Sequence, residues 1–316
     1  MKISVYRDIE SLKKVKSPVV SIGFFDGVHL GHKYLLKQLT EVSDERGVDH
    51  LLISMWPHPR AIVQNIQTDN FLLNTLNEKI ELFRNNNIKN LLILDFNKEL
   101  AGISSEDFIK KILLDRLNAS AILLGFNNSF GKQSSTTTQL GNIASKYPIE
   151  LIKSEPCCKQ FTDVEISSSA IRDLLLKGKV EEANQLLGYS YTWSGNVKNG
   201  YKVGRSLGFP TANLEALDIN KIIPDTGVYL VYAHIGNKKM KGLLNIGYRP
   251  TFNRETKSVE LHIIDFNQDI YDIDIKLEFV KYLRNEKLFD NVEALKKQLN
   301  KDLIEAVDFF SKKRGL

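Results

Sequence analysis

The sequence predicts an α/β domain with a doubly wound parallel sheet, followed by a small antiparallel β-barrel domain with a C-terminal helix. From Val19 to about Leu187, short and continuously apolar runs alternate with helical patterns, as expected for parallel strands buried on both faces. Beyond that point, short strand-like runs are separated by Gly, Asn and Asp turns, which is typical of a barrel. A long amphipathic pattern follows them. We therefore predict domains at residues 1–187 and 188–316.

The predicted elements of the first domain come from hydrophobic periodicity and helix caps. One helix is expected at 29–47, because Leu35, Leu39 and Val42 form one stripe. A second follows at 76–86, and a third at 104–117 with a Ser cap and an acidic first turn. The helical segment 170–187 either belongs to this domain or joins the two. Strands are expected at 19–23, 50–55, 90–96, 120–126 and 149–154.

The predicted barrel is built from short runs that alternate in part between apolar and polar residues. Its last element is a helix at 291–313, whose apolar stripe is wide enough to dock on the barrel. The stripe consists of Val292, Leu295, Leu299, Leu303, Ala306 and Phe310. Strands are expected at 192–200, 227–236, 238–247, 258–266 and 274–283.

Composition narrows the classes of function. The chain has 316 residues, 42% hydrophobic and 26% charged, which are values for a globular protein. A net charge of +5 without a basic run interleaved with aromatics predicts no nucleic-acid partner. No run reaches the roughly 18 apolar residues of a membrane span, and the N-terminus lacks a secretory pattern, so a cytoplasmic protein with no membrane partner is expected. The adjacent Cys157 and Cys158 are interpreted as free thiols.

The stretch GFFDGVHLGH places His29 and His32 three residues apart, directly after the first predicted strand and at the start of a helix. Ligands of α/β sheets bind beyond the carboxyl ends of strands, and a helix N-terminus favours an anion. Glycines at 23, 27 and 31 let backbone approach such a ligand. A zinc pair would usually be His at i and i+4 with a Glu, so a phosphate site is favoured over zinc or an ordinary surface pair.

This stretch resembles the HxGH signature of nucleotidylyltransferases, in particular the adenylyltransferase half of the bifunctional riboflavin kinase/FMN adenylyltransferase family. The resemblance implies a nucleotidylyltransferase-like fold. It also implies catalytic roles for His29 and His32, and ATP or phosphate contacts from Gly23, Phe25, Asp26 and Gly31.

Three further stretches carry the resemblance through the first domain. ISSSAIR, 166–172, is similar to the family's second signature and implies phosphate contacts by Ser168 and Ser169 and a catalytic Arg172. WPHPR resembles the family's PHP loop. GFNNSFG resembles a flavin loop and implies contacts by Asn127, Asn128 and Phe130. Asn128 stands where the family has an aromatic residue, so weaker FMN binding is predicted.

The stretch VGRSLGFPTANL is the main candidate site of the barrel. Because GxxxxGK[ST] is missing from the sequence, a P-loop kinase is excluded. Gly204 and Gly208 can bring backbone N–H groups to phosphates, and Thr211 and Asn213 offer oxygen ligands to Mg²⁺ if the segment is extended. A plain Gly/Pro turn is the alternative.

The segment resembles the PTAN motif of riboflavin kinases, and NIGYRPTF and SVELHIIDF match later family motifs in order. The resemblance implies a catalytic base at Glu260, a supporting His262, and a flavin neighbour at Arg284. Glu260 and His262 should face away from Val259 and Leu261 on their strand.

The resemblance implies an Mg²⁺-dependent enzyme that converts riboflavin and ATP to FMN, and then FMN and ATP to FAD. Two alternatives remain at this stage. One is a riboflavin kinase whose first domain is a degenerate flavin- or nucleotide-binding module, which the departure at Asn128 favours. The other is a non-enzymatic regulator that senses flavins.

Overall fold

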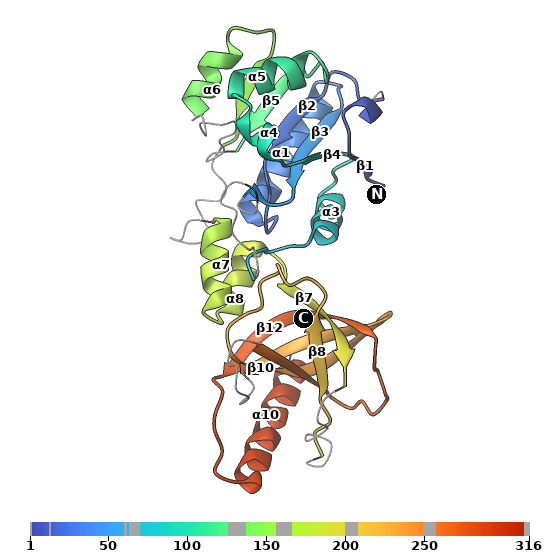
Figure 1. Cartoon of the computed structure of the whole chain (residues 1–316), viewed down its shortest axis with the longest axis vertical. Helices are drawn as coiled ribbons and strands as arrows, with labels where there is room; N and C mark the ends of the chain where they lie inside the picture. The colour runs from blue at the N-terminus through green and yellow to red at the C-terminus, as the bar shows by residue number, and fades with distance from the viewer. Residues whose placement is uncertain are drawn as a thin grey trace. The chain divides into compact units, whose positions relative to one another are not determined.

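The computed structural model describes residues 2–12, 14–59, 62, 70–125, 137–155, 166–199, 208–248 and 257–312. The chain forms two compact units, each with its own sheet (Figure 1). The first unit contains Met1–Thr68 and Leu72–Ser168. The second contains Asp69–Phe71 and Ser169–Leu316.

The first unit contains a six-stranded sheet in the order β1-β4-β3-β2-β5-β6, and its strand pairs are parallel. This confirms the predicted parallel sheet, and adds a short edge strand that the sequence pattern did not reveal. The strands are β1 (Ser4–Tyr6), β2 (Val19–Ile22), β3 (His50–Trp56), β4 (Asn90–Asp95), β5 (Ala121–Leu124) and β6 (Glu150–Lys153).

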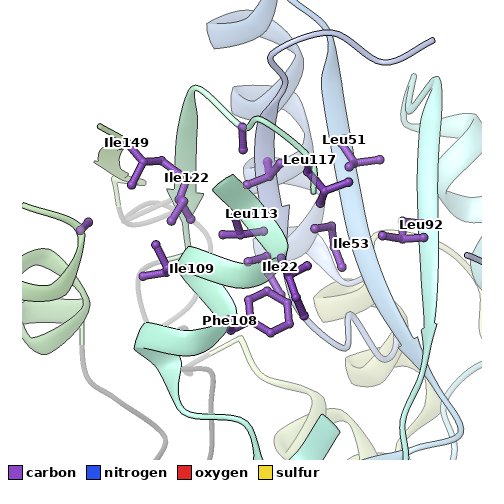
Figure 2. Close-up of a cluster of buried hydrophobic side chains, with 14 of the residues drawn as sticks. Ile22, Leu51, Ile53, Leu92, Phe108, Ile109, Leu113, Leu117, Ile122 and Ile149 are labelled. Atoms are coloured by element: carbon purple, nitrogen blue, oxygen red, sulfur yellow. The ribbon is translucent and has the colours of Figure 1, made fainter. Parts of the chain in front are cut away.

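Alternate residues of the central strands enter two separate cores, which explains why the strands are continuously apolar. Ile22, Leu51 and Ile53 point to one face, where they meet Phe108 and Leu113 (Figure 2). Leu52, which lies between Leu51 and Ile53 in the sequence, belongs to the core of the opposite face. That second core contains Val19, Leu52, Leu91, Leu36, Leu39 and Phe83. Helices therefore cover both faces, as the doubly wound prediction requires.

The helices confirm two of the three predictions for this unit and modify the third. The confirmed helices are α1 (Leu30–Glu45) and α3 (Leu76–Asn85), the latter with a capping box between Thr75 and Glu78. The predicted helix at 104–117 starts at a Ser104 cap as α5 (Ser105–Asp107) and continues as a π-helix, η2 (Phe108–Leu114). Other short helices are η1 (Glu10–Leu12), α4 (Lys98–Gly102) and α6 (Thr137–Ala144).

The strand order places the end of β2 at a topological switch point. From β2 the chain moves to β3 and β4 on one side, and later to β5 and β6 on the other side. In open α/β sheets such a point opens a crevice beyond the carboxyl ends of the strands. The histidine motif follows β2 directly, so it lies at this point.

The second unit is built on a closed antiparallel barrel in the order β10-β11-β8-β7-β12-β9, which confirms the predicted barrel. One strand, β8, was expected only as a possible extended segment. The strands are β7 (Thr192–Lys198), β8 (Ala212–Ala216), β9 (Gly227–Ile235), β10 (Lys238–Tyr248), β11 (Lys257–Ile263) and β12 (Asp274–Arg284).

The C-terminal helix α10 (Val292–Lys312) docks on the barrel through the predicted stripe, in which Ala306 and Phe310 are buried. These two side chains share a core with Val228, Leu230 and Leu243 of the strands. At the start of the helix, Val292 is exposed instead. None of the helices in the described part of the chain combines the length and hydropathy of a membrane span.

Two helices that precede the barrel belong to the same compact unit. They are α7 (Ser168–Leu176) and α8 (Val180–Leu187). Asn184 donates from Nδ2 to the carbonyl of Phe279 at 2.9 Å, and Glu181 accepts the backbone N–H of Tyr282 at 3.0 Å. The compact boundary therefore lies at 168/169 rather than at residue 187. The assignment of the two chemistries to 1–187 and 188–316 stays a prediction.

Candidate functional site

The histidine pair of the first unit forms the start of α1. His29 is the N-cap, and its Nδ1 accepts the backbone N–H of His32 at 3.3 Å. Because Nδ1 is the acceptor, the neutral ring of His29 carries its proton on Nε2. The two imidazoles are stacked, with centroids 3.6 Å apart and planes inclined by 16°. The cap thus fixes both the tautomer and the orientation of one ring, and the stacking aligns the second ring with it.

His32 is held in its neutral form. Burial lowers the pKa of its imidazole well below the ordinary value, and the neighbouring His29 and Lys79 lower this pKa further. Its Nδ1 is buried without a hydrogen-bond partner among the described residues. A neutral imidazole can donate a hydrogen bond from one ring nitrogen and accept one at the other.

The loop between β2 and α1 has a strained backbone. Phe25 and Val28 adopt φ values of 55° and 34°, in the left-handed region that disfavours non-glycine residues. A Cβ on Gly23 would come within 3.0 Å of the Phe25 ring, and one on Gly31 would lie 3.3 Å from the His29 ring. Both glycines therefore provide room for aromatic rings at the site. The Phe25 ring itself is buried, so a nucleotide contact by this residue would use its backbone.

Buried polar groups hold this loop in place. The carboxylate of Asp26 accepts the backbone N–H groups of Leu73 and Asn74 at 3.2 and 3.3 Å. The Asp26 carbonyl accepts the Ser168 hydroxyl at 2.8 Å, which brings the start of the ISSSAIR motif to the GFFDG loop. In the PHP loop, the His58 ring contacts the Phe24 ring edge-on at 4.1 Å. Three motifs that are distant in sequence therefore meet beyond β2.

The remaining predicted residues of this site differ in position. Ser169 is exposed near the start of α7. Arg172, in the second unit, donates from Nε to the carbonyl of Phe71 at 3.0 Å and stacks over the ring of that residue at 4.1 Å. Its phosphate contact stays a prediction. Asn127, Asn128 and Phe130, which are predicted to contact the flavin, lie outside the described residues.

The barrel contains a pocket of about 300 Å³ that includes the predicted base. Val259, Leu261 and Ile263 are buried while Glu260 and His262 line the pocket, which confirms the predicted alternation. Within the described residues, the Glu260 carboxylate has no hydrogen-bond partner. The pocket is lined by Phe209, Thr211, Val228, Leu243, Leu244, Asn245, Glu260, His262, Arg284, Glu286, Lys287, Phe289, Leu295, Leu299 and Asp302.

Strand register brings the PTAN segment beside this base. Asn213 of β8 lies directly opposite Glu260 of β11, and opposite residues of antiparallel strands present their side chains on the same face. Thr211 is exposed and lines the pocket. His262 is hydrogen-bonded through Nδ1 to the carbonyl of Pro210 at 2.9 Å, so it anchors the residue before Thr211. Gly208 has a φ of 83°, which favours glycine, whereas Gly204 lies outside the described residues.

Arg284 lines the same pocket and is oriented by a buried carboxylate. Its Nε and Nη2 donate to Asp302 of α10 at 2.7 to 3.0 Å, and Gln298 donates to the same carboxylate at 2.7 Å. The side chains of Arg284 and Asp302 are 15% and 4% exposed. This pairing fixes the guanidinium in the pocket wall. Contact of Arg284 with a flavin stays a prediction.

Sequence reasoning missed two buried charged residues of these sites, Lys79 and Asp302. Both occupy positions of amphipathic helices where a charge is normally solvated. Asp302 is adjacent to Leu303 of the apolar stripe, which was the one available signal. Lys79 is fully buried, and nothing in its local sequence distinguishes it from a surface lysine.

Known proteins match both units in this order. A relative from Bacillus subtilis (strain 168), named bifunctional riboflavin kinase/FMN adenylyltransferase, is 36% identical over 301 residues, covering 94% of this chain and 93% of the relative. A protein of the same name from Listeria monocytogenes is 33% identical over 297 residues and covers 93% of each chain.

The chain belongs to the bifunctional riboflavin kinase/FMN adenylyltransferase family. The family model described as FAD synthetase matches residues 12–170, and the model described as riboflavin kinase matches residues 187–310. The histidine site thus falls in the FAD synthetase match, and the Glu260 pocket falls in the riboflavin kinase match.

A solved structure is similar to this chain over nearly its whole length. The structure titled as a macrolide-efflux protein from Streptococcus pneumoniae has a TM-score of 0.84 and 28% sequence identity. The match covers 96% of this chain and 97% of that chain. It supports the order of α/β unit and barrel found here.

Proposed function

We propose that this chain is a flavin-cofactor enzyme that makes FMN in its barrel and FAD at the histidine site. The observation that carries the first step is that Glu260 and Thr211 line one pocket, while Asn213 lies opposite Glu260 in the strand register. The first step transfers a phosphoryl group from ATP to riboflavin. The second transfers an adenylyl group from another ATP to FMN. Because both steps consume ATP, we place the enzyme in the cytoplasm. Its proposed substrates are small molecules, and we propose neither a nucleic-acid nor a membrane partner.

In the kinase step, the Glu260 carboxylate accepts the proton of the terminal ribityl hydroxyl of riboflavin. The resulting oxygen forms a bond to the γ-phosphorus of ATP, and the bond from that phosphorus to the β,γ-bridging oxygen breaks, so that ADP leaves. The open carboxylate and its place in the pocket wall are compatible with this role. Arg284, fixed by Asp302, supplies donors at the same wall.

Magnesium is the expected cofactor of both steps, and the donor set of the barrel fits it. Asn213 in β8 offers an amide oxygen, and Thr211, which directly precedes β8, offers a hydroxyl. Mg²⁺ prefers hard oxygen ligands of this kind. When bound, the ion would offset the negative charge of the phosphates. Gly204 and Gly208 are proposed to bring backbone N–H groups to the same phosphates.

In the adenylyl step, a phosphate oxygen of FMN forms a bond to the α-phosphorus of ATP. The bond to the α,β-bridging oxygen breaks, and pyrophosphate leaves. The nucleophile is already an anion, so catalysis needs orientation and charge stabilisation more than a base. The Nε2–H of His29, the neutral His32 and the N-terminus of α1 provide donors. Ser168, Ser169 and Arg172 are assigned to phosphate contacts, and Asn127, Asn128 and Phe130 to the flavin, on the family motifs.

The proposal is tested by incubating the protein with riboflavin and Mg-ATP and separating the flavins by chromatography. FMN and FAD together support it. FMN alone favours the alternative in which the first unit is a degenerate binding module, and the absence of both products would leave only a flavin-sensing role.

A second assay locates the chemistry. Glu260→Gln should lower the rate of riboflavin phosphorylation by at least about 10²-fold and leave FAD formation from supplied FMN unchanged. Glu278→Gln is the matched control, because Glu278 belongs to β12, a strand of the same barrel that is not paired with β11, and it pairs with His234 and Lys239. Equal loss of both reactions in folded Glu260→Gln protein would refute two independent sites.

A further inference from the structure

A lysine is buried beneath the histidine site. Lys79 belongs to the first turn of α3 and is 0% exposed. Its ammonium group lies 2.5 Å from the carbonyl oxygen of Phe24 and 4.0 Å from the centroid of the Phe24 ring. A buried ammonium is costly unless it is paired, so a lysine at this position needs a reason.

The carbonyl that Lys79 contacts marks the start of the strained loop. The Ser54 hydroxyl, from β3, also reaches the Phe24 carbonyl, at 3.3 Å. The next residue, Phe25, has the positive φ of 55° described above. A conformation of this kind persists only where surrounding contacts determine it. The Phe24 carbonyl is therefore a fixed point from which the loop departs.

Ring contacts connect this loop to the imidazoles of His32 and His29. The Phe25 ring contacts the His32 ring edge-on, with centroids 5.2 Å apart. His32 is in turn stacked on His29. An error of about 1 Å in the position of a reacting group lowers a rate by about 10²-fold. The rate of adenylyl transfer is therefore expected to depend on how firmly the start of this loop is held.

We propose that Lys79 is a positioning residue for adenylyl transfer, because its ammonium group holds the Phe24 carbonyl and thereby the loop that orients His29 and His32. This inference rests on the adenylyltransferase function proposed above. Lys79 is too deeply buried to contact either substrate, so it acts through the loop.

The lysine also gives the reaction a dependence on pH. Burial lowers the pKa of Lys79 to about 8, and the nearby Asp26 carboxylate opposes this shift. The other titratable groups around the loop are His29 and His32 at the N-terminus of α1, and His58, whose ring contacts the Phe24 ring edge-on. The ammonium is present below about pH 8 and is lost above it. Replacing a charge-assisted bond by a neutral one should then lower kcat for FAD formation about fivefold between pH 7 and pH 9.5.

The test compares Lys79→Met with Lys79→Arg in the full chain. Lys79→Met should lower kcat for FAD formation from supplied FMN by about 10²-fold, change KM for FMN and ATP by less than about threefold, and remove the alkaline decrease. Lys79→Arg keeps a positive charge, so it should retain more activity than Lys79→Met and move the decrease to higher pH. Lys37→Met, on the exposed part of α1, is the control and should keep wild-type kinetics.

The phosphorylation of riboflavin in the same samples serves as the internal control for an intact second unit, and circular dichroism with thermal melting reports whether the first unit of each variant folds. If Lys79→Met does not fold, the pH profiles of wild type and Lys79→Arg decide. A kcat of Lys79→Met within about threefold of wild type, or an alkaline decrease that is unchanged in either variant, would overturn the inference. A wild-type protein that makes no FAD would overturn the proposed function and this inference together, whereas active Lys79→Met overturns the inference alone.

Discussion

The ion pair between Arg284 and Asp302 allows a quantitative test of how the barrel and α10 hold each other. Asp302→Asn keeps the shape of the side chain but removes its charge and turns one acceptor oxygen into a donor. Three contacts of 2.7 to 3.0 Å from Arg284 and one from Gln298 converge on this carboxylate. The variant therefore leaves a guanidinium in the pocket wall with at least one donor facing another donor.

The expected cost follows from burial. Removing one partner of a buried pair costs about 3–5 kcal/mol, and the 15% exposure of Arg284 allows some hydration, so we expect a loss of about 2–4 kcal/mol for the second unit. For a unit of this size that corresponds to a decrease in Tm of about 6–12 °C. Riboflavin affinity should fall as well, because Arg284 lines the pocket.

The assay is urea denaturation monitored by tryptophan fluorescence in a Trp56→Phe background. The chain has 2 tryptophans, and the remaining one, Trp193, is buried in β7 of the barrel. Its signal then reports the second unit alone.

Asp308→Asn is the matched control. Asp308 belongs to the same helix and pairs with Lys312 at 2.7 Å, but the lysine and aspartate side chains are 75% and 58% exposed. Its loss should cost less than about 0.5 kcal/mol. Equal destabilisation by the two substitutions, or a loss below about 1 kcal/mol for Asp302→Asn, would refute the assignment of a buried and structurally required pair.

Three further outcomes are expected. His32→Ala should lower kcat for FAD formation by about 10²–10³-fold, with FMN accumulating from riboflavin, and wild-type FAD formation would contradict its role. His262→Ala should lower kcat of riboflavin phosphorylation by about tenfold, because it releases the carbonyl before the PTAN threonine, and FAD formation from supplied FMN should stay constant. Gly23→Ala should cost about 1–3 kcal/mol in the unfolding free energy of the first unit, since its Cβ meets the Phe25 ring at 3.0 Å; Gly102→Ala, with open space, should be neutral in the same thermal melt.

Features that depend on near neighbours in the chain could be predicted from the amino-acid sequence alone. Apolar runs specified the central strands, because burial on both faces of the sheet selects a continuous run. The stripe of α10 specified its docking face, because burial of one helix face selects residues at a period of 3.6. The histidine motif could also be predicted from the sequence, because His29, which caps α1, and Gly31 lie within three residues of each other. The predicted helix at 104–117 was only partly correct. Its start could be predicted from the Ser104 cap, but no cap or apolar stripe indicates that it continues as a π-helix.

Features that depend on partners distant in sequence became visible only in the folded chain. Strand order placed β2 at the switch point, and register placed Asn213 opposite Glu260. Periodicity states which face a residue occupies, but not which strand lies beside it. The grouping of α7 and α8 with the barrel was undecidable for the same reason.

Buried charges show this division most clearly. Lys79 reaches Phe24 across 55 residues, and Arg284 reaches Asp302 across 18. In the sequence each is an ordinary charged residue of a helix or strand, for which solvation is the usual fate. Only folding removes water from these groups and brings each to a partner distant in sequence, because burying a charge without a partner costs too much free energy. Local chemistry therefore determined where the two sites begin, and long-range packing determined which side chains hold them in place.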